Sequence, residues 1–167
     1  MGVLAARAVG GMHGWIARTG SCIRLHVAVG RNSRPRNQRY VRFHVLDDAE
    51  TVAVDGARVT SILRTLVDCA AMMPRRYAMA PIDSALRQGK TTVEQMLEYV
   101  DAIPMLRDRE RIRAVLAQGD GRVENGGESE CRAVLDELGF PVHRVQVEFP
   151  CLSHPGRVHR WIFSGNE

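Results

Sequence analysis

Arginines are concentrated in the polar segment GRNSRPRNQR, which contains Arg31, Arg34, Arg36 and Arg39. Guanidinium groups on an irregular segment can contact the phosphates of a nucleic-acid backbone. Such contacts give affinity and salt dependence without reading the base sequence. The same spacing fits a solvated loop equally well. We take these four arginines as the candidate nucleic-acid-binding residues.

Two other groups of polar side chains have spacings that could form an ion pair or a metal site. Arg64 and Asp68 are four residues apart in a helical pattern, where an ion pair more often ties a helix into the fold than performs chemistry. Cys151, His154 and His159 are loosely spaced metal-binding types, but a structural zinc site needs four ligands. We therefore expect a fold-stabilising ion pair and no metal site.

The elements around the arginines are predicted from the alternation of apolar and polar residues. This alternation predicts strands over residues 22–29 and 41–46, and we interpret the pair as a long hairpin with the arginines at its tip. Val52 and Val54 predict a third short strand, and Asp55-Gly56 is typical of a tight turn.

Helical periodicity begins at Thr60, with Thr60 or Ser61 as the cap, and Pro74 predicts the end of this helix. Pro81 argues against one uninterrupted helix in the following segment. We therefore predict a break immediately before Pro81 and a short helix from Pro81 to Gln88, followed by a glycine stop.

A capping box of Thr91 and Glu94 predicts the start of the next helix. The remaining elements are expected in this order: an amphipathic helix over 105–118, a linker over 119–127, a helix ending at Gly139, and strands over 143–149 and 157–163.

Composition narrows the class of protein. The 167 residues are 45% hydrophobic and 25% charged, with a net charge of +4, as in an ordinary globular protein with a mildly basic balance. No apolar run approaches the roughly 18 residues of a membrane span, and we identify no signal peptide. The expectation is a cytoplasmic protein with no membrane association and with reduced thiols.

Several stretches resemble a bacterial family of AbiEi-type antitoxin-like proteins. DGARVTSILRTLVDCA and IDSALRQGKTTVEQML carry the resemblance, together with the Glu-Ser helix start and GFPVHRVQV. Asp55–Ala70 is its most specific part, and the resemblance covers about residues 5–163. It implies a winged helix, a middle β-plus-helical region and a C-terminal part similar to very-short-patch-repair endonucleases of the PD-(D/E)XK type.

The resemblance also implies a candidate catalytic set. Glu128 matches the helix acid of the family, and Gln146 and Arg160 match polar positions on its strands. In an intact site such residues would help to place a divalent metal. Here Ile162 replaces the strand acid, and the winged helix and the third strand with its lysine are missing. Glu128 also fits a first-turn acid, favoured by the helix dipole.

The predicted fold is α+β, with a small N-terminal antiparallel sheet, a central helical cluster and a C-terminal helix–β-hairpin resembling a truncated PD-(D/E)XK core. The predicted domains are a β-plus-helical antitoxin-like region over 1–118, the linker over 119–127, and a partial nuclease-like helix–hairpin over 128–167.

The function implied is a non-catalytic protein that binds DNA or a cognate toxin-like protein and needs no cofactor. One alternative is an active metal-dependent DNA endonuclease, which would use Mg²⁺. Another is a truncated fragment with no present activity. We also expect that the C-terminal edge strand can pair two copies into a homodimer.

Overall fold

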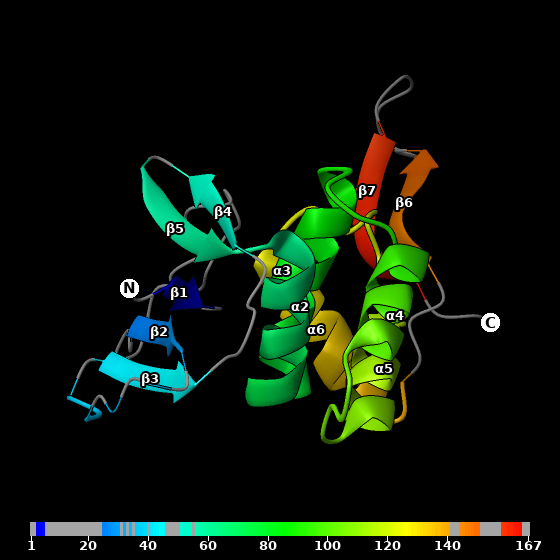
Figure 1. Ribbon diagram of the computed structural model, residues 1–167. Helices are drawn as coiled ribbons and strands as arrows, with labels where there is room; N and C mark the ends of the chain where they lie inside the picture. The colour runs from blue at the N-terminus through cyan, green and yellow to red at the C-terminus, as the bar shows by residue number, and fades with distance from the viewer. Residues whose placement is uncertain are drawn as a thin grey trace.

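The fold of this chain is given by a computed structural model that describes residues 3–5, 25–30, 32, 34, 36–39, 41–45, 51–54, 56–140, 144–150 and 158–164. Within those residues the chain forms a small sheet, then a cluster of helices, and finally a two-stranded hairpin (Figure 1). Because strands and helices occupy separate parts of the chain, the predicted α+β class is confirmed.

Five short strands form the N-terminal sheet, in the spatial order β3-β2-β1-β5-β4. They are β1 (Val3–Ala5), β2 (Leu25–Val29), β3 (Val41–Val45), β4 (Thr51–Val54) and β5 (Ala57–Thr60). The β1–β2 and β4–β5 pairs are antiparallel, as expected for this sheet, whereas the β1–β5 and β2–β3 pairs are parallel.

The predicted long hairpin between residues 22–29 and 41–46 is wrong. The strands β2 and β3 run parallel, with Leu25 opposite Val41 and Val29 opposite Val45. A strand of this length extends for only about 17 Å, so residues 30–40 can return the chain to the start of the next strand. The arginine-rich segment is therefore a crossover, which we define as residues 30–40, and not a hairpin tip.

The crossover also covers part of the outer edge of β3. Gln38 and Val41 exchange backbone hydrogen bonds of 2.9 and 3.3 Å, and the Phe43 N–H donates to Asn37 Oδ1 at 2.8 Å. An edge strand with open N–H groups invites pairing with another chain. These contacts hold the crossover against the sheet and satisfy part of that edge.

The predicted turn between the last two strands is confirmed at Gly56, which takes a φ of 77° between β4 and β5. A residue with a side chain is strained at such a φ, and glycine is not. The strand β5 was not predicted as a separate element. Its Val59 is fully buried, at 0% exposure.

The first helix of the cluster, α2 (Ile62–Met72), follows β5 directly. Ser61 is its cap, as one of the two predicted alternatives, and Ser61 Oγ accepts from the Arg64 N–H at 3.3 Å. The helix ends before Pro74, as predicted. Leu66 is fully buried on its inner face.

The predicted break immediately before Pro81 is wrong. The helix α3 runs from Arg75 to Arg87 with Pro81 inside it. A proline in a helix interior costs about 3 kcal/mol through the lost N–H bond and a clash. The neighbouring Met79 and Ile82 are both fully buried, and burial of each such side chain stabilises the fold by about 1.5–3 kcal/mol. Packing therefore outweighs the local preference.

The next helix, α4 (Val93–Ala102), starts one residue later than predicted. Its capping box is formed by Thr92 and Gln95 rather than by Thr91 and Glu94. The Thr92 N–H donates to Gln95 Oε1 at 3.0 Å, and Thr92 Oγ1 accepts from the Gln95 N–H at 3.3 Å.

The last two helices are α5 (Arg109–Leu116) and α6 (Gly126–Glu137). The helix predicted over 105–118 is shortened at its start, because Met105 and Asp108 have φ values of 50° and 56° in the left-handed region. The fully buried side chains of the helical cluster come from α2, α3, α4 and α5, and include Leu66, Ile82, Met96, Ile112 and Leu116.

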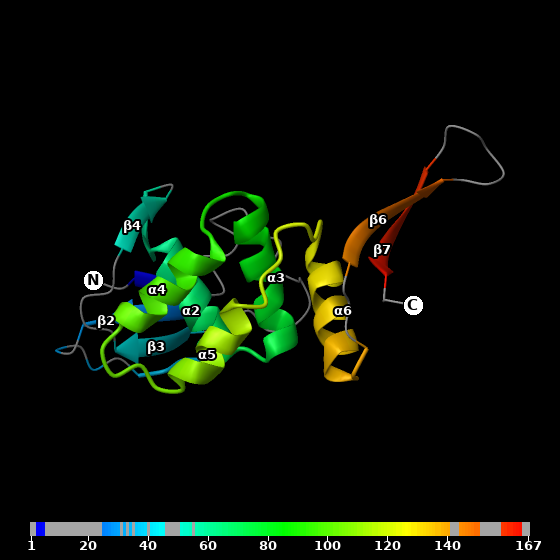
Figure 2. The ribbon, with the colours of Figure 1, turned by 90° about the vertical axis from the view of Figure 1, so that its right-hand side faces the viewer.

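The hairpin consists of β6 (Arg144–Pro150) and β7 (Val158–Ser164), paired antiparallel with Val147 opposite Trp161. The predicted strand pair is therefore confirmed. Figure 2 shows the hairpin extending past α6, away from the other helices. In the described part of the chain, no helix is long and apolar enough to cross a membrane.

Candidate functional site

Three of the predicted nucleic-acid-binding arginines are described by the structure, on the crossover between β2 and β3. Arg34, Arg36 and Arg39 are exposed there, and Arg31 lies outside the described residues. Because β2 and β3 are parallel, the crossover connects the end of β2 to the start of β3. Three of the four predicted side chains are thus exposed. Nucleic-acid binding by them stays a prediction.

Sequence reasoning missed a wider signal around these arginines. The first 46 residues contain eight arginines and no aspartate or glutamate. The whole chain has a net charge of only +4, so the remainder of the chain is net acidic. The excess of positive charge is therefore concentrated in the part of the chain that forms β1, β2, the crossover and β3. Such an asymmetry is the electrostatic pattern expected of a surface for a polyanion.

The most specific motif of the family resemblance builds the junction between the sheet and the helices. Arg64 Nε donates to Asp68 Oδ1 at 3.0 Å within α2, and Asp68 is buried. The hydroxyl oxygens of Thr60 and Thr65 are 2.8 Å apart, which links β5 to the first turn of α2. The predicted role of the Arg64–Asp68 pair as a structural tie is consistent with this position.

Two ionisable groups at this junction have shifted pKa values. Burial raises the pKa of Asp68, and the charge of Arg64 opposes the rise. Burial likewise lowers the pKa of His44 on β3, and the carboxylate of Asp68 opposes that change. Both shifts have the signature of groups withdrawn from water. The two side chains influence each other across the β3–α2 contact.

Glu128 lies in the first turn of α6 and is 8% exposed. One carboxylate oxygen accepts from the Glu124 N–H at 3.0 Å, and the other accepts from Asn125 Nδ2 at 2.5 Å. Asn125 Oδ1 accepts in turn from the Glu128 N–H at 3.0 Å. Asn125 is therefore the N-cap of α6, and both oxygens of the candidate metal ligand accept hydrogen bonds from the segment that starts the helix.

The other members of the candidate catalytic set lie on the hairpin. Gln146 is in β6 and Arg160 is in β7, where Arg160 pairs with Glu148. The side chains of Gln146, Arg160 and Ile162 lie outside the described residues, as do Cys151 and His154. A meeting of Glu128 with the two strand residues therefore stays a prediction. Among the described side chains, no three His, Cys, Asp or Glu residues gather as a metal site would require.

A buried ion pair joins α6 to α3 beside a small hollow of the surface. Arg132 donates to both carboxylate oxygens of Asp83, at 3.0 and 2.9 Å, and Asp83 is 1% exposed. Asp83 Oδ1 also accepts from the Asp120 N–H at 2.8 Å. Burial raises the pKa of Asp83, and the charge of Arg132 opposes the rise.

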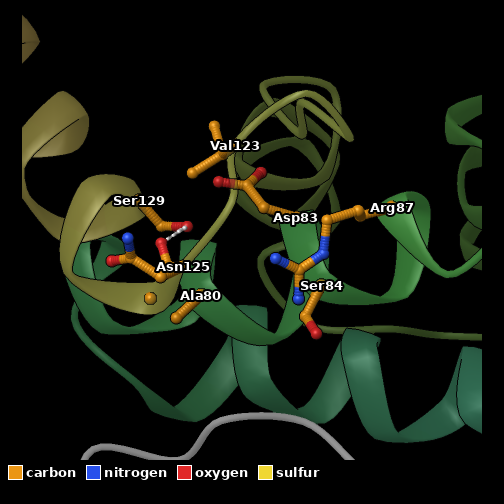
Figure 3. Close-up of a pocket in the computed structure, with 8 residues that line it drawn as sticks. Ala80, Asp83, Ser84, Arg87, Val123, Asn125 and Ser129 are labelled. Carbon is orange, nitrogen blue, oxygen red and sulfur yellow. Dashed lines mark hydrogen bonds between the residues drawn. The ribbon is translucent and has the colours of Figure 1, made fainter. Parts of the chain in front are cut away.

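The hollow is lined from α3 by Asp83, Ser84 and Arg87, and from the start of α6 by Asn125 and Ser129 (Figure 3). Its cavity volume is about 10 Å³, which is room for about one water molecule. Pockets that bury a small molecule usually measure about 300–1,000 Å³. The hollow therefore marks the seam between the two helices and is too small for a substrate.

The predicted linker, residues 119–127, is packed along this seam. A Cβ atom at Gly119 would come within 2.6 Å of Leu86, and one at Gly121 within 3.2 Å of the Arg87 backbone. Val123 is buried, at 1% exposure. The glycines that suggested a flexible connection are required for close approach to α3. How the chain divides into domains stays a prediction.

The chain belongs to the AbiEi antitoxin C-terminal domain family, which it matches over residues 4–118. The family resemblance read from the residues is thereby confirmed for the antitoxin-like part. The match ends before Glu128 and the hairpin.

Two curated relatives from Mycobacterium tuberculosis, of the strains CDC 1551 and H37Rv, are each described as an uncharacterized protein. Each is 32% identical to this chain over 114 residues, which is 66% of this chain and 40% of the relative. The chain therefore matches less than half of the length of these relatives.

Proposed function

We propose that this chain is a non-catalytic, antitoxin-like protein that binds the phosphate backbone of DNA through its basic crossover. The observation that carries the proposal is the exposure of Arg34, Arg36 and Arg39 within an N-terminal region that has no acidic residue. Membership of an antitoxin family supports a role related to toxin–antitoxin systems.

The charge distribution favours backbone contacts over base reading. Arginine side chains on an irregular segment can follow phosphates, but base reading requires an element that fits into a groove. The crossover is held to the sheet by Asn37 and Gln38, so its arginines project from a supported backbone. We therefore expect binding that depends on salt and only weakly on sequence.

A degenerate nuclease-like C-terminus is the second part of the proposal. Two observations support it: both Glu128 oxygens already accept hydrogen bonds at the start of α6, and Ile162 stands at the expected acid position. A divalent metal needs several oxygen ligands, and a carboxylate that already accepts these hydrogen bonds is poorly placed to supply one.

A cognate toxin-like protein is the second candidate partner, and it rests on the family match. A homodimer through the C-terminal hairpin also remains a proposal. In the described residues β6 and β7 form a sheet of two strands, so each has an outer edge that another strand could join.

The test of DNA binding is a titration of a fluorescent duplex with three proteins. These are the wild type, a crossover variant with Arg34, Arg36 and Arg39 changed to Ala, and a charge-matched control. The control changes Arg76, Arg87 and Arg107, which are exposed on or beside the helices. We expect the crossover variant to bind at least about tenfold more weakly at low salt, because up to three phosphate contacts are lost.

The control should bind nearly as well as the wild type. If both variants lose the same affinity, the loss reflects the net charge of the protein and not the position of the arginines. Unchanged binding by the crossover variant would contradict the proposal. Circular dichroism on all three proteins verifies that the fold is retained.

A further inference from the structure

One face of the sheet carries two arginines and a histidine outside the crossover. Side chains alternate between the two faces of a strand, so Arg42 and His44 of β3 share a face. On β5, Arg58 is exposed and the adjacent Val59 is fully buried on the opposite face. We call the surface formed by Arg42, His44 and Arg58 the polar sheet face.

The strand register places both ends of this surface on the same side of the sheet. His44 of β3 is opposite Ala28 of β2, and Ala28 is opposite Val3 of β1. Leu4 is opposite Val59, so the residue before each, Val3 and Arg58, are also neighbours. His44 and Arg58 therefore lie in one cross-strand row, about 14 Å apart over three strand spacings.

The two arginines of this face differ from most arginines of the helical cluster in their partners. Arg64, Arg75, Arg113 and Arg132 each form an ion pair with an aspartate. Within the described residues, Arg42 forms no ion pair, and Arg58 donates to a neutral acceptor, Thr51 Oγ1, at 2.8 Å. These helical arginines are paired inside the fold, whereas Arg42 and Arg58 are exposed and have no carboxylate partner among the described residues.

The two arginines of this face are exposed, whereas His44 between them is half-buried and lies within the electrostatic reach of Asp68 of α2. Ala53 of β4 is opposite Arg58 and is also exposed, so no bulky side chain stands between Arg58 and solvent on that side. At the other end, β3 is adjacent in the chain to the crossover and its exposed Arg39. The polar sheet face and the crossover can therefore be contacted by one extended anion.

We propose that the polar sheet face is a second phosphate-contacting surface, in which Arg42 and Arg58 hold the backbone of the nucleic acid that the crossover also contacts. This inference rests on the proposed function and extends it from a basic segment to a surface that spans the sheet. The guanidinium groups of Arg42 and Arg58 lie on strands that are three strand spacings apart, so they would contact separate phosphates of a nucleic acid. The contact fixes the orientation of the bound strand and adds no base reading.

The experiment compares the salt dependence of duplex binding in four proteins. They are the wild type, Arg42→Ala/Arg58→Ala, Arg42→Lys/Arg58→Lys, and the control Arg87→Ala/Arg107→Ala on the helical side. Loss of two phosphate contacts should reduce the slope of log affinity against log salt by about 1.8 in the alanine variant. The lysine variant keeps the charges and should retain most of the slope.

An unchanged slope in the alanine variant, or the same reduction in the control, would overturn the inference while leaving the crossover in place as the binding segment. Absence of any binding by the wild type would overturn the proposed function and this inference together. The lysine variant separates lost charge from disturbed folding. Lysine keeps the charge at position 58 but does not reproduce the geometry of the arginine contact with Thr51. A folding defect caused by losing that contact would therefore appear in the lysine variant as well.

Discussion

Arg132 of α6 and Asp83 of α3 form a two-point ion pair, with nitrogen–oxygen distances of 3.0 and 2.9 Å. The Arg132 side chain is 15% exposed and that of Asp83 is 1% exposed. Arg132 also donates to the Gln118 carbonyl oxygen at 3.0 Å. The pair connects the part of the chain that matches the antitoxin family with a helix that lies beyond the match.

Asp83→Asn should lower the free energy of unfolding by about 3 kcal/mol, because it leaves the buried guanidinium of Arg132 without a counter-charge. Urea unfolding measures this change. The matched control is Arg122→Ala, which breaks an exposed pair with Asp120 and should cost less than about 1 kcal/mol. Equal shifts of the two midpoints would contradict a structural role for the buried pair.

A chain that ends at residue 118 should be much less stable than one that ends at residue 140. Arg75 of α3 donates to the Ala133 carbonyl oxygen at 3.0 Å and to Asp136 at 2.5 Å. A chain that ends at residue 118 loses these bonds and the Arg132 partner of Asp83, and Arg75 keeps its bond to Gln118. Thermal unfolding of the two chains checks this. If both melt cooperatively at the same temperature, then α6 is an appendage and not part of the folded unit.

Glu128→Ala should weaken the start of α6 by about 1 kcal/mol. We expect no nuclease activity in the wild type, and therefore none for this substitution to abolish. Supercoiled plasmid incubated with Mg²⁺ or Mn²⁺ provides the measurement. Cleavage by the wild type that disappears in Glu128→Ala, while the fold is retained, would show that the active-endonuclease alternative is correct.

Acidification should destabilise the protein through His44. Burial lowers its folded pKa below the ordinary value of 6.5, so the unfolded state binds the proton more readily. The stability that His44 contributes is therefore present above pH 6.5 and is lost as the pH falls. The melting temperature should fall between pH 7.5 and pH 5.5, with a smaller fall in His44→Gln. Identical falls in the two proteins would assign the effect to other groups.

Local sequence signals predicted the elements that depend on a few adjacent residues. Ser61 and Pro74 bound α2 as expected, and Gly56 makes the turn between β4 and β5. Each of these signals acts through its own backbone geometry or its own hydrogen bond, so no distant contact is needed to interpret it.

The errors arose where distant contacts decide the outcome. Alternation of side chains is the same in parallel and antiparallel strands, so the pairing of β2 with β3 could not be read from it. Pro81 is tolerated because α3 is buried against the cluster, and Gly119 and Gly121 serve close packing rather than flexibility. Arg42 and Arg58 became part of a candidate surface only once the register placed them on one face.

The most direct test of the central proposal is the salt dependence of wild-type binding to a labelled duplex of arbitrary sequence. If the crossover and the polar sheet face contact the backbone, log affinity should fall linearly with log salt, with a slope of roughly −3 or steeper. A second duplex of unrelated sequence should give nearly the same line. No binding at low salt, or binding whose affinity does not change with salt, would contradict the proposal.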